Sequence, residues 1–407
     1  MNLFTEHWDA GLPRSLRSAL LVDQYNLPRY WSTVWAMMNL SALADTTRVK
    51  KLRYIERLYC HADQLRGPGA LDDALGAIDH VALAEILESW FVTIHNQPEI
   101  SGADELCWKT GLEFVVNTTT WLSKGHPANK KLPAIEQRLY QLNLLYGQLH
   151  IRPRRSVETV RSLPASVVQA MYDVLDPETS KNPFKQARTR WRVYVIFILM
   201  LHQGLRRGEL LLLATDSIKS AFDRKQGRQR YWLNVQGNPY DDEVIDARHS
   251  RPSIKTETSI RQIPVSELVA SIIQIYTENF RGKPEHPFLL NSQLDSPLST
   301  ESISKAFSAI TQALPTAVLK ELEDRTGKCS VSPHDLRHTC AVLRLNQLLV
   351  QEDPMDVALA KLRTFFGWSK ASNMPARYAR AVFEDRLAEV WNNAFDDRAE
   401  LLRAIPK

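Results

Sequence analysis

The sequence predicts a mainly α-helical protein with a small antiparallel β-hairpin sheet, divided into two domains. Apolar residues recur at helical spacing through the first third of the chain and again after Ser266. Between Ile218 and Val265 the pattern changes toward alternation and is interrupted by glycines and prolines, which is typical of strands joined by loops. A length of 407 residues is enough for two or three domains, and we expect two.

The first domain is expected to be a helical DNA-binding domain over residues 1–155. Apolar positions at helical spacing predict helices near residues 52–66, 81–93, 105–122 and 134–148. Basic residues crowd the first helix, and a second basic group precedes a linker at residues 156–162. We expect these cations to contact a phosphate backbone. They are Arg48, Lys50, Lys51, Arg53, Arg154 and Arg155.

The second domain is expected over residues 163–407 and begins with a helix that runs to Leu175, with a proline in its first turn. Two strands are predicted at residues 231–235 and 260–265. Helices then return at residues 268–280, 303–314, 317–324, 334–349, 355–365 and 379–395. An apolar stripe on the last helix is expected to dock either on a neighbouring protomer or on its own domain.

A basic segment at residues 181–192 leads into the apolar run 193–201. It contains five cations and no acidic residue, and Lys185, Arg188 and Arg190 are its candidate DNA contacts. The alternative is an ordinary solvated face, since runs of charge are usually exposed surface.

Composition narrows the class of protein. The net charge is only +5, so the distribution of charge rather than its total must carry any argument for nucleic-acid binding. The four cysteines are widely spaced, which is typical of reduced thiols, and the start of the chain does not resemble a secretory signal. The longest apolar run has nine residues, too few for a membrane helix, so we expect a cytoplasmic protein without a membrane partner.

Four residues suggest phosphoryl chemistry. Tyr378 is the only tyrosine after Tyr276, and a phenol can act as a nucleophile when its neighbours support it. The planar forks of Arg206 and Arg337 can each meet two oxygens of a five-coordinate phosphate. His334 lies three positions before Arg337, so both project from one helix face.

Two further residues, close in sequence to these four, have alternative interpretations. Glu209 lies three positions after Arg206 and either orients it by an ion pair or forms an exposed pair of little consequence. His334 and His338 have the i, i+4 spacing of a zinc helix, but Asp335 replaces the glutamate of that motif and no third ligand stands out. We therefore expect no metal and no other cofactor.

These boxes, in this order, resemble those of the tyrosine recombinase, or phage integrase, family. The resemblance covers residues 163–381 and rests on the sequences GLRRGEL, HDLRHT, FFGW and RYAR, with SIKT before RQIP as a lysine segment. It implies a helical DNA-clamping domain followed by an α+β catalytic domain of the recombinase type. It also implies a homotetramer on double-stranded DNA, assembled through exchange of the C-terminal helix.

The resemblance implies a role for each residue. Tyr378 would attack the scissile phosphate to form a 3′-phosphotyrosyl link, while Arg206 and Arg337 would stabilise the phosphorane. His334 and the indole N–H of Trp368 would donate hydrogen bonds. Lys255 would protonate the leaving 5′-oxygen, with Lys219 and Lys225 as alternatives. Glu209 and His338 would not touch the phosphate themselves but would position the residues that do.

The sequence departs from the family pattern at two places. Trp368 stands where many members have histidine, so this position cannot transfer a proton. Tyr378 follows Trp368 by ten positions, one more than is common, and we expect an unusually shaped loop to carry it.

We therefore expect a site-specific recombinase of a mobile element, acting at the nucleoid. A catalytically silent DNA-binding protein of the same fold is the alternative hypothesis. A relaxing enzyme of the type IB topoisomerase kind shares the chemistry and would differ in not requiring two paired sites.

Overall fold

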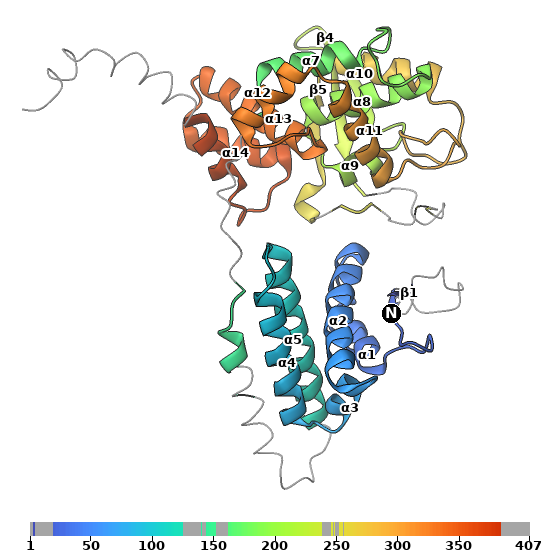
Figure 1. Ribbon diagram of the computed structural model, residues 1–407. Coiled ribbons are helices and arrows are strands. Elements are labelled where there is room, and N and C mark those ends of the chain that lie inside the picture. Colours follow the sequence, from blue (N-terminus) through green and yellow to red (C-terminus); the bar gives the residue numbers. More distant parts are fainter. Residues whose placement is uncertain are drawn as a thin grey trace, which may run out of the picture. The chain divides into compact units, whose positions relative to one another are not determined.

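A computed structural model defines the architecture of the chain (Figure 1). The chain forms two compact units, Met1–Val157 and Glu158–Lys407. The structure describes residues 3–4, 19–124, 140, 144–151, 162–237, 246, 248, 252–254 and 256–383.

The first unit is a helical bundle whose long helices α2, α4 and α5 pack against one another (Figure 1). A two-residue antiparallel pair, β1 with β2, precedes the helices. The core is rich in aromatic residues, with Tyr59, Trp108 and Phe114 fully buried. The elements are β1 (Leu3–Phe4), β2 (Leu20–Leu21), α1 (Tyr30–Asn39), α2 (Asp45–Arg66), α3 (Ala70–Gly76), α4 (His80–His95) and α5 (Gly102–Lys124).

The predicted helices at residues 81–93 and 105–122 are confirmed as α4 and α5. Asp79 begins α4 by accepting hydrogen bonds from the N–H groups of Val81 and Ala82. Most of the predicted helix at residues 134–148 lies outside the described residues, as does the predicted linker at residues 156–162 with the cations Arg154 and Arg155.

The second unit surrounds a central buried helix, α8, with further helices and a three-stranded sheet (Figure 1). Its elements are α7 (Ala165–Leu175), α8 (Ala187–Gln203), α9 (Arg207–Leu212), β3 (Ile218–Asp223), β4 (Arg228–Val235), η2 (Glu257–Ser259), β5 (Arg261–Val265), α10 (Glu267–Ile275), η3 (Tyr276–Phe280), α11 (Thr300–Ala313), α12 (Thr316–Thr326), α13 (Pro333–Val350) and α14 (Met355–Phe366).

The sheet has the order β3-β4-β5 and is antiparallel throughout. Leu233 pairs with both Ile218 and Ile263, and Leu233 and Ile263 are buried in the core. Alternate residues of β4 and β5 face this core, which explains the alternating sequence pattern. The predicted fold class, mainly helical with a small antiparallel sheet, is confirmed.

The structure corrects four details of the predicted elements. The two predicted strands are joined by a third, β3, whose mostly exposed residues left only a weak apolar signal. Pro164 precedes α7 as its N-cap rather than lying inside its first turn. The helix predicted to run to residue 280 ends as α10 at Ile275 and continues as a π-helix, η3. Finally, Tyr378 lies inside a helical stretch at residues 374–383 and not on a loop.

Two glycines place the site elements close together. Gly204 ends α8 with φ of 58°, and a Cβ there would lie 2.4 Å from the Phe366 ring. Gly367 ends α14 with φ of 61°, and a Cβ there would lie 2.8 Å from the Thr258 carbonyl oxygen. Both positions require the left-handed backbone and close approach that glycine permits.

In the described part of the chain, no helix combines the length and the apolar character that a membrane span would need.

Candidate active site

Five of the six predicted catalytic residues, all except Lys255, come from four elements that meet near the end of α8. Arg206 is the N-cap of α9, and His334 and Arg337 lie in the first turns of α13. Trp368 follows α14, and Tyr378 lies on the helical stretch at residues 374–383. The fold therefore joins sequence boxes that are far apart in the chain.

Glu209 is the centre of a charged cluster. Its carboxylate accepts hydrogen bonds from Arg206 Nη1 at 2.5 Å and from Arg261 Nη2 at 3.1 Å, and it lies 3.7 Å from Arg337 Nη1. Its side chain is only 1% exposed, so the alternative of an exposed, inconsequential pair is wrong. We call Arg206, Glu209, Ser259, Arg261 and Arg337 the Glu209 cluster.

The buried Glu209 carboxylate is stabilised by the arginines around it, whereas the arginines oppose one another. Burial alone would raise the pKa of Glu209, but Arg261, Arg337 and Arg206 outweigh it and hold that pKa below its ordinary value. Burial and the neighbouring Arg206 cation lower the pKa of Arg337 to about 9, which still leaves its guanidinium charged at neutral pH. The cluster thus carries three cations against one carboxylate.

Arg337 is held on every side. It donates hydrogen bonds to the carbonyl oxygens of Gly204 and Phe366, the latter at 2.9 Å, and its guanidinium lies over the Phe366 ring. Its side chain is 3% exposed, whereas that of Arg206 is 25% exposed. Arg206 is therefore the cation of this pair that is presented more fully to an approaching anion.

Arg261 and Ser259 are members of the cluster that sequence reasoning did not identify as site residues. Arg261 donates to the carbonyl oxygens of Phe365 at 2.7 Å and Ser259 at 2.6 Å, besides Glu209. The Ser259 hydroxyl accepts from Arg206 Nη1 at 3.0 Å. The sequence does place an arginine, Arg261, at the start of the strand that follows the predicted lysine segment. Its partners are distant in sequence, so the sequence alone does not show that Arg261 belongs to the site.

Tyr378 is enclosed by aromatic side chains. Its side chain is fully buried, and its ring stacks on Trp368 with centroids 5.2 Å apart and an angle of 14° between the planes. Trp368 in turn stacks on Phe366 at 4.8 Å. The Tyr378 hydroxyl lies 2.6 Å from Nδ1 of His338. We call His338, Phe366, Trp368 and Tyr378 the tyrosine pocket.

The ionisation of the tyrosine pocket follows from its burial. Burial raises the pKa of Tyr378 well above its ordinary value, so the phenol keeps its proton. Burial, followed by the neighbouring His334, lowers the pKa of His338 to about 4. Burial and the Arg337 cation also lower the pKa of His334, whose ring centroid lies 4.1 Å from that of His338. Both imidazoles are therefore neutral at pH 7.

Asp335, which stands where a zinc helix has its glutamate, has a structural role. It caps α13 with Ser332 and accepts a hydrogen bond from Lys328 Nζ at 2.5 Å. Within the described ranges, no group of three or more histidine, cysteine, aspartate or glutamate side chains is arranged to hold a metal ion.

Lys255 lies outside the described residues. The described residues before it pass close to α9, where a Cβ on Gly208 would lie 3.1 Å from the carbonyl oxygen of Ser253. Of the alternatives, Lys219 is on β3 and pairs with Asp216 at 2.9 Å, while Lys225 is exposed in the turn between β3 and β4.

The predicted DNA-binding cations of the second unit differ in how their side chains are used. Arg190 donates to the carbonyl oxygens of Phe184, Pro177 and Thr179, and Arg188 donates to Asp295 and to the backbone. Lys185 is exposed. The two arginines thus already support the fold, and Lys185 is the better-presented cation.

The predicted DNA-binding cations of α2 are likewise divided into those bonded within the fold and those that are exposed. Arg48 is buried and donates to the carbonyl oxygen of Ser41, and Lys51 pairs with Glu113 at 2.9 Å. Lys50 and Arg53 are exposed.

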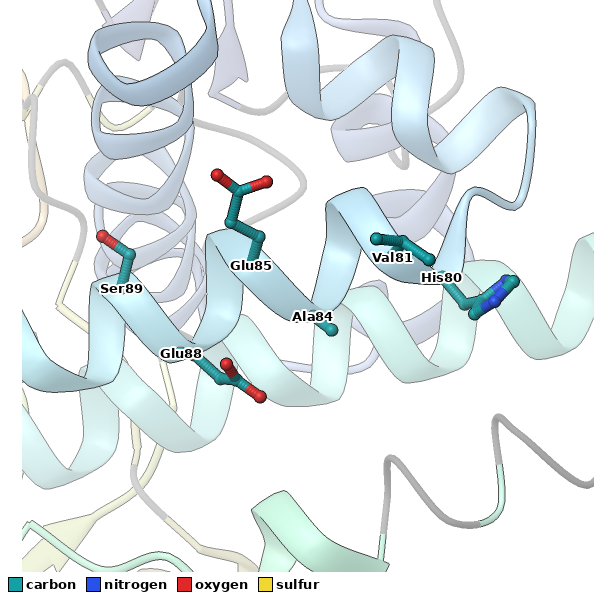
Figure 2. A pocket seen from close by; sticks show the side chains of 6 residues that line it. All are labelled: His80, Val81, Ala84, Glu85, Glu88 and Ser89. Carbon is teal, nitrogen blue, oxygen red and sulfur yellow. The ribbon is translucent and has the colours of Figure 1, made fainter.

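A separate hollow on α4 contains none of the predicted site residues (Figure 2). Its polar side chains already have partners: Glu85 pairs with Arg66 at 2.6 Å, and Glu88 accepts from the Tyr146 hydroxyl. The lining residues, all on α4, are His80, Val81, Ala84, Glu85, Glu88 and Ser89.

Comparison with known proteins gives a family and two structures of similar chains. The model of the phage integrase family matches residues 161–384, more than half of the chain. The crystal structure of XerA recombinase is 14% identical, with a TM-score of 0.36, and the match covers 83% of this chain and 98% of that one. The XerH site-specific recombinase bound to palindromic difH substrate, a post-cleavage complex, is 12% identical, with a TM-score of 0.39 and coverage of 88% and 98%. Among curated proteins there is no match.

Proposed function

Because the chain belongs to the phage integrase family, we propose that it is a site-specific recombinase that cuts and rejoins DNA through a phosphotyrosyl intermediate. The observation that carries this proposal is the meeting of Arg206, Arg337 and Tyr378 at one place in the second unit. A protein that only binds DNA has no need to keep a phenol beside two arginine forks.

The reaction would exchange one phosphorus–oxygen bond for another, and the Tyr378 hydroxyl would lose its proton to a base as its oxygen attacks. The Tyr378 oxygen attacks the scissile phosphorus and forms a 3′-phosphotyrosyl bond, while the bond from phosphorus to the 5′-oxygen breaks. Lys255 gives a proton to that leaving oxygen. Since one phosphodiester replaces another, the later attack of a 5′-hydroxyl reverses the step without ATP.

Arg206 and Arg337 would hold the non-bridging oxygens of the phosphate in the transition state. Glu209 supports this role because it accepts hydrogen bonds from Arg206 and lies near Arg337, which orients both cations. His334 and the Trp368 indole N–H would add hydrogen bonds to the same phosphate. Tyr378 is fully buried, so DNA binding or assembly would have to uncover it before attack.

We also propose a separate role for each domain. Residues 1–155 would bind the DNA, with a linker at 156–162, and residues 163–407 would perform the chemistry. The exposed Lys50, Arg53 and Lys185 are the best-presented candidates to contact the phosphate backbone. Four protomers would act together on double-stranded DNA of a mobile element, at the nucleoid.

A DNA-binding protein without turnover is the second candidate function. The complete burial of Tyr378 favours it, because a covered phenol cannot reach a phosphate.

Incubation with nicked duplexes taken from the DNA that flanks the gene would separate the two functions. The recombinase proposal expects a covalent protein–DNA adduct that Tyr378→Phe abolishes. The exposed Tyr25 provides a matched control, and Tyr25→Phe should leave the adduct unchanged. Tight binding without any adduct would establish the binding-only function, and relaxation by a single protomer would indicate the topoisomerase kind.

A further inference from the structure

We propose that His338 is the general base that takes the proton from Tyr378 when the phenol attacks DNA. This inference rests on the proposed function and adds a catalytic role for a residue that the sequence suggested only as a support. It is carried by the geometry of the tyrosine pocket.

The contact itself is direct and short. Nδ1 of His338 lies 2.6 Å from the hydroxyl oxygen of Tyr378, within the range expected for a general base and the proton that it takes. His338 lies on α13 one turn after His334 and in the same helix as Arg337. The base therefore belongs to the same helix as two of the proposed phosphate-binding groups, His334 and Arg337.

The direction of this hydrogen bond follows from the ionisation of its partners. A buried phenol that keeps its proton is the donor, so Nδ1 accepts and the remaining proton of the neutral imidazole is on Nε2. The charged and titratable groups that shift the pKa of His338 are His334, Asp335, Lys328 and Arg337. Asp335 raises this pKa and the other three lower it. A neutral imidazole with a free acceptor nitrogen can accept the proton. Its pKa of about 4 makes it a weak base in the DNA-free protein, and the negative charge of an entering phosphate would raise that pKa.

The stacking in the pocket orients the phenol for this transfer. Trp368 holds the Tyr378 ring by a nearly parallel stack, and the ring of His338 lies 5.6 Å away at 50°. In the step, the O–H proton of Tyr378 moves to Nδ1 as the oxygen bonds to phosphorus. The resulting imidazolium returns the proton to the phenol when the phosphotyrosyl bond is broken.

Substitution combined with a more acidic phenol tests the proposal. His338→Asn keeps a hydrogen-bond acceptor but removes the basic nitrogen, and we expect adduct formation to slow by about 10²-fold or more. Replacing Tyr378 with a trifluorinated tyrosine, which ionises more readily, should shrink this deficit at least tenfold because the phenol then needs less help. A deficit of unchanged size would overturn the proposal, since a merely structural defect would not respond to phenol acidity.

A bridging-sulfur substrate separates His338 from the leaving-group acid. With sulfur in place of the leaving 5′-oxygen, Lys255→Ala should regain its rate, because a thiolate leaves without a proton. The His338→Asn deficit should persist, and its disappearance would assign His338 to the leaving group instead. If the unsubstituted protein forms no adduct, the proposed function itself fails.

A measurement on the unsubstituted protein does not depend on any variant folding. Isotope-labelled histidine reports by nuclear magnetic resonance which nitrogen of His338 carries the proton. We expect the proton on Nε2. A proton on Nδ1 would make His338 a donor to the phenol and would overturn the proposal.

Discussion

The Glu209 cluster and the tyrosine pocket lie side by side in the second unit but are held together by different forces. In the cluster, each buried guanidinium has several acceptors, and Arg337 alone reaches two backbone carbonyls and lies near a carboxylate. In the pocket, Tyr378 is fully buried in an apolar cluster, stacked on Trp368 and joined to His338 by a hydrogen bond. The difference indicates a rigid phosphate-binding half fixed by polar contacts and a nucleophile fixed mainly by apolar and aromatic packing.

The largest expected effect is on the rigid half. Arg337→Lys should lower adduct formation by about 10²–10³-fold while much of the DNA affinity remains, because an ammonium cannot reproduce the bidentate fork. The check is single-turnover cleavage beside a binding titration, with Arg224→Lys on the exposed turn after β3 as the control. Near-normal cleavage would remove Arg337 from the phosphate site.

Glu209→Gln should destabilise the second unit by roughly 3–5 kcal/mol, because it leaves buried guanidinium groups without their counter-charge. Denaturant unfolding measures this loss. Asp216→Asn breaks only the exposed pair with Lys219 and should cost at most about 1 kcal/mol. Similar values for the two variants would show that the cluster is not the rigid element described above.

The stability difference between the unsubstituted protein and Glu209→Gln should depend on pH. The pKa of Glu209 is lower in the folded protein than its ordinary value of about 4.3, so its stabilising contribution is present above that pH. The contribution is lost as the pH falls through the folded pKa. The stability gap between the unsubstituted protein and Glu209→Gln should therefore be constant near neutral pH and narrow below about pH 4.

A smaller effect is expected in the tyrosine pocket. Trp368→Phe keeps an aromatic ring between Phe366 and Tyr378 but removes the indole N–H. Losing one hydrogen bond to the phosphate should slow adduct formation by about tenfold, equal to roughly 1.4 kcal/mol. An unchanged rate would reduce Trp368 to stacking alone.

The smallest expected effect concerns DNA contacts away from the site. Lys185→Gln should lower the salt slope of DNA binding by about one, because it removes a single phosphate contact. Arg190→Gln should instead destabilise the fold, since it loses hydrogen bonds to backbone carbonyls. Salt titrations and unfolding curves for both variants check the distinction, and an unchanged slope for Lys185→Gln would make it ordinary surface.

Much of the fold could be predicted because its signals are local. The helices α4, α5, α11, α13 and α14 repeat their apolar residues every turn, and β4 and β5 alternate them, so each pattern reports one neighbouring surface. Strand β3 was not predicted because its residues are largely exposed and so do not alternate between apolar and polar. The helix that carries Tyr378 begins at residue 374, five positions before the predicted start, because Pro375 fits within the first turn of a helix.

The residue types and their order along the chain were determined by the sequence itself, which was enough to indicate two arginine forks, a phenol and the family. Only the tertiary structure decided that Glu209 is buried among three arginines, that Arg261 joins them, and that the phenol meets His338. The physical reason is that these contacts join residues up to 128 positions apart, such as Glu209 and Arg337. Burial and hydrogen bonding then set the charges, and no local pattern records them.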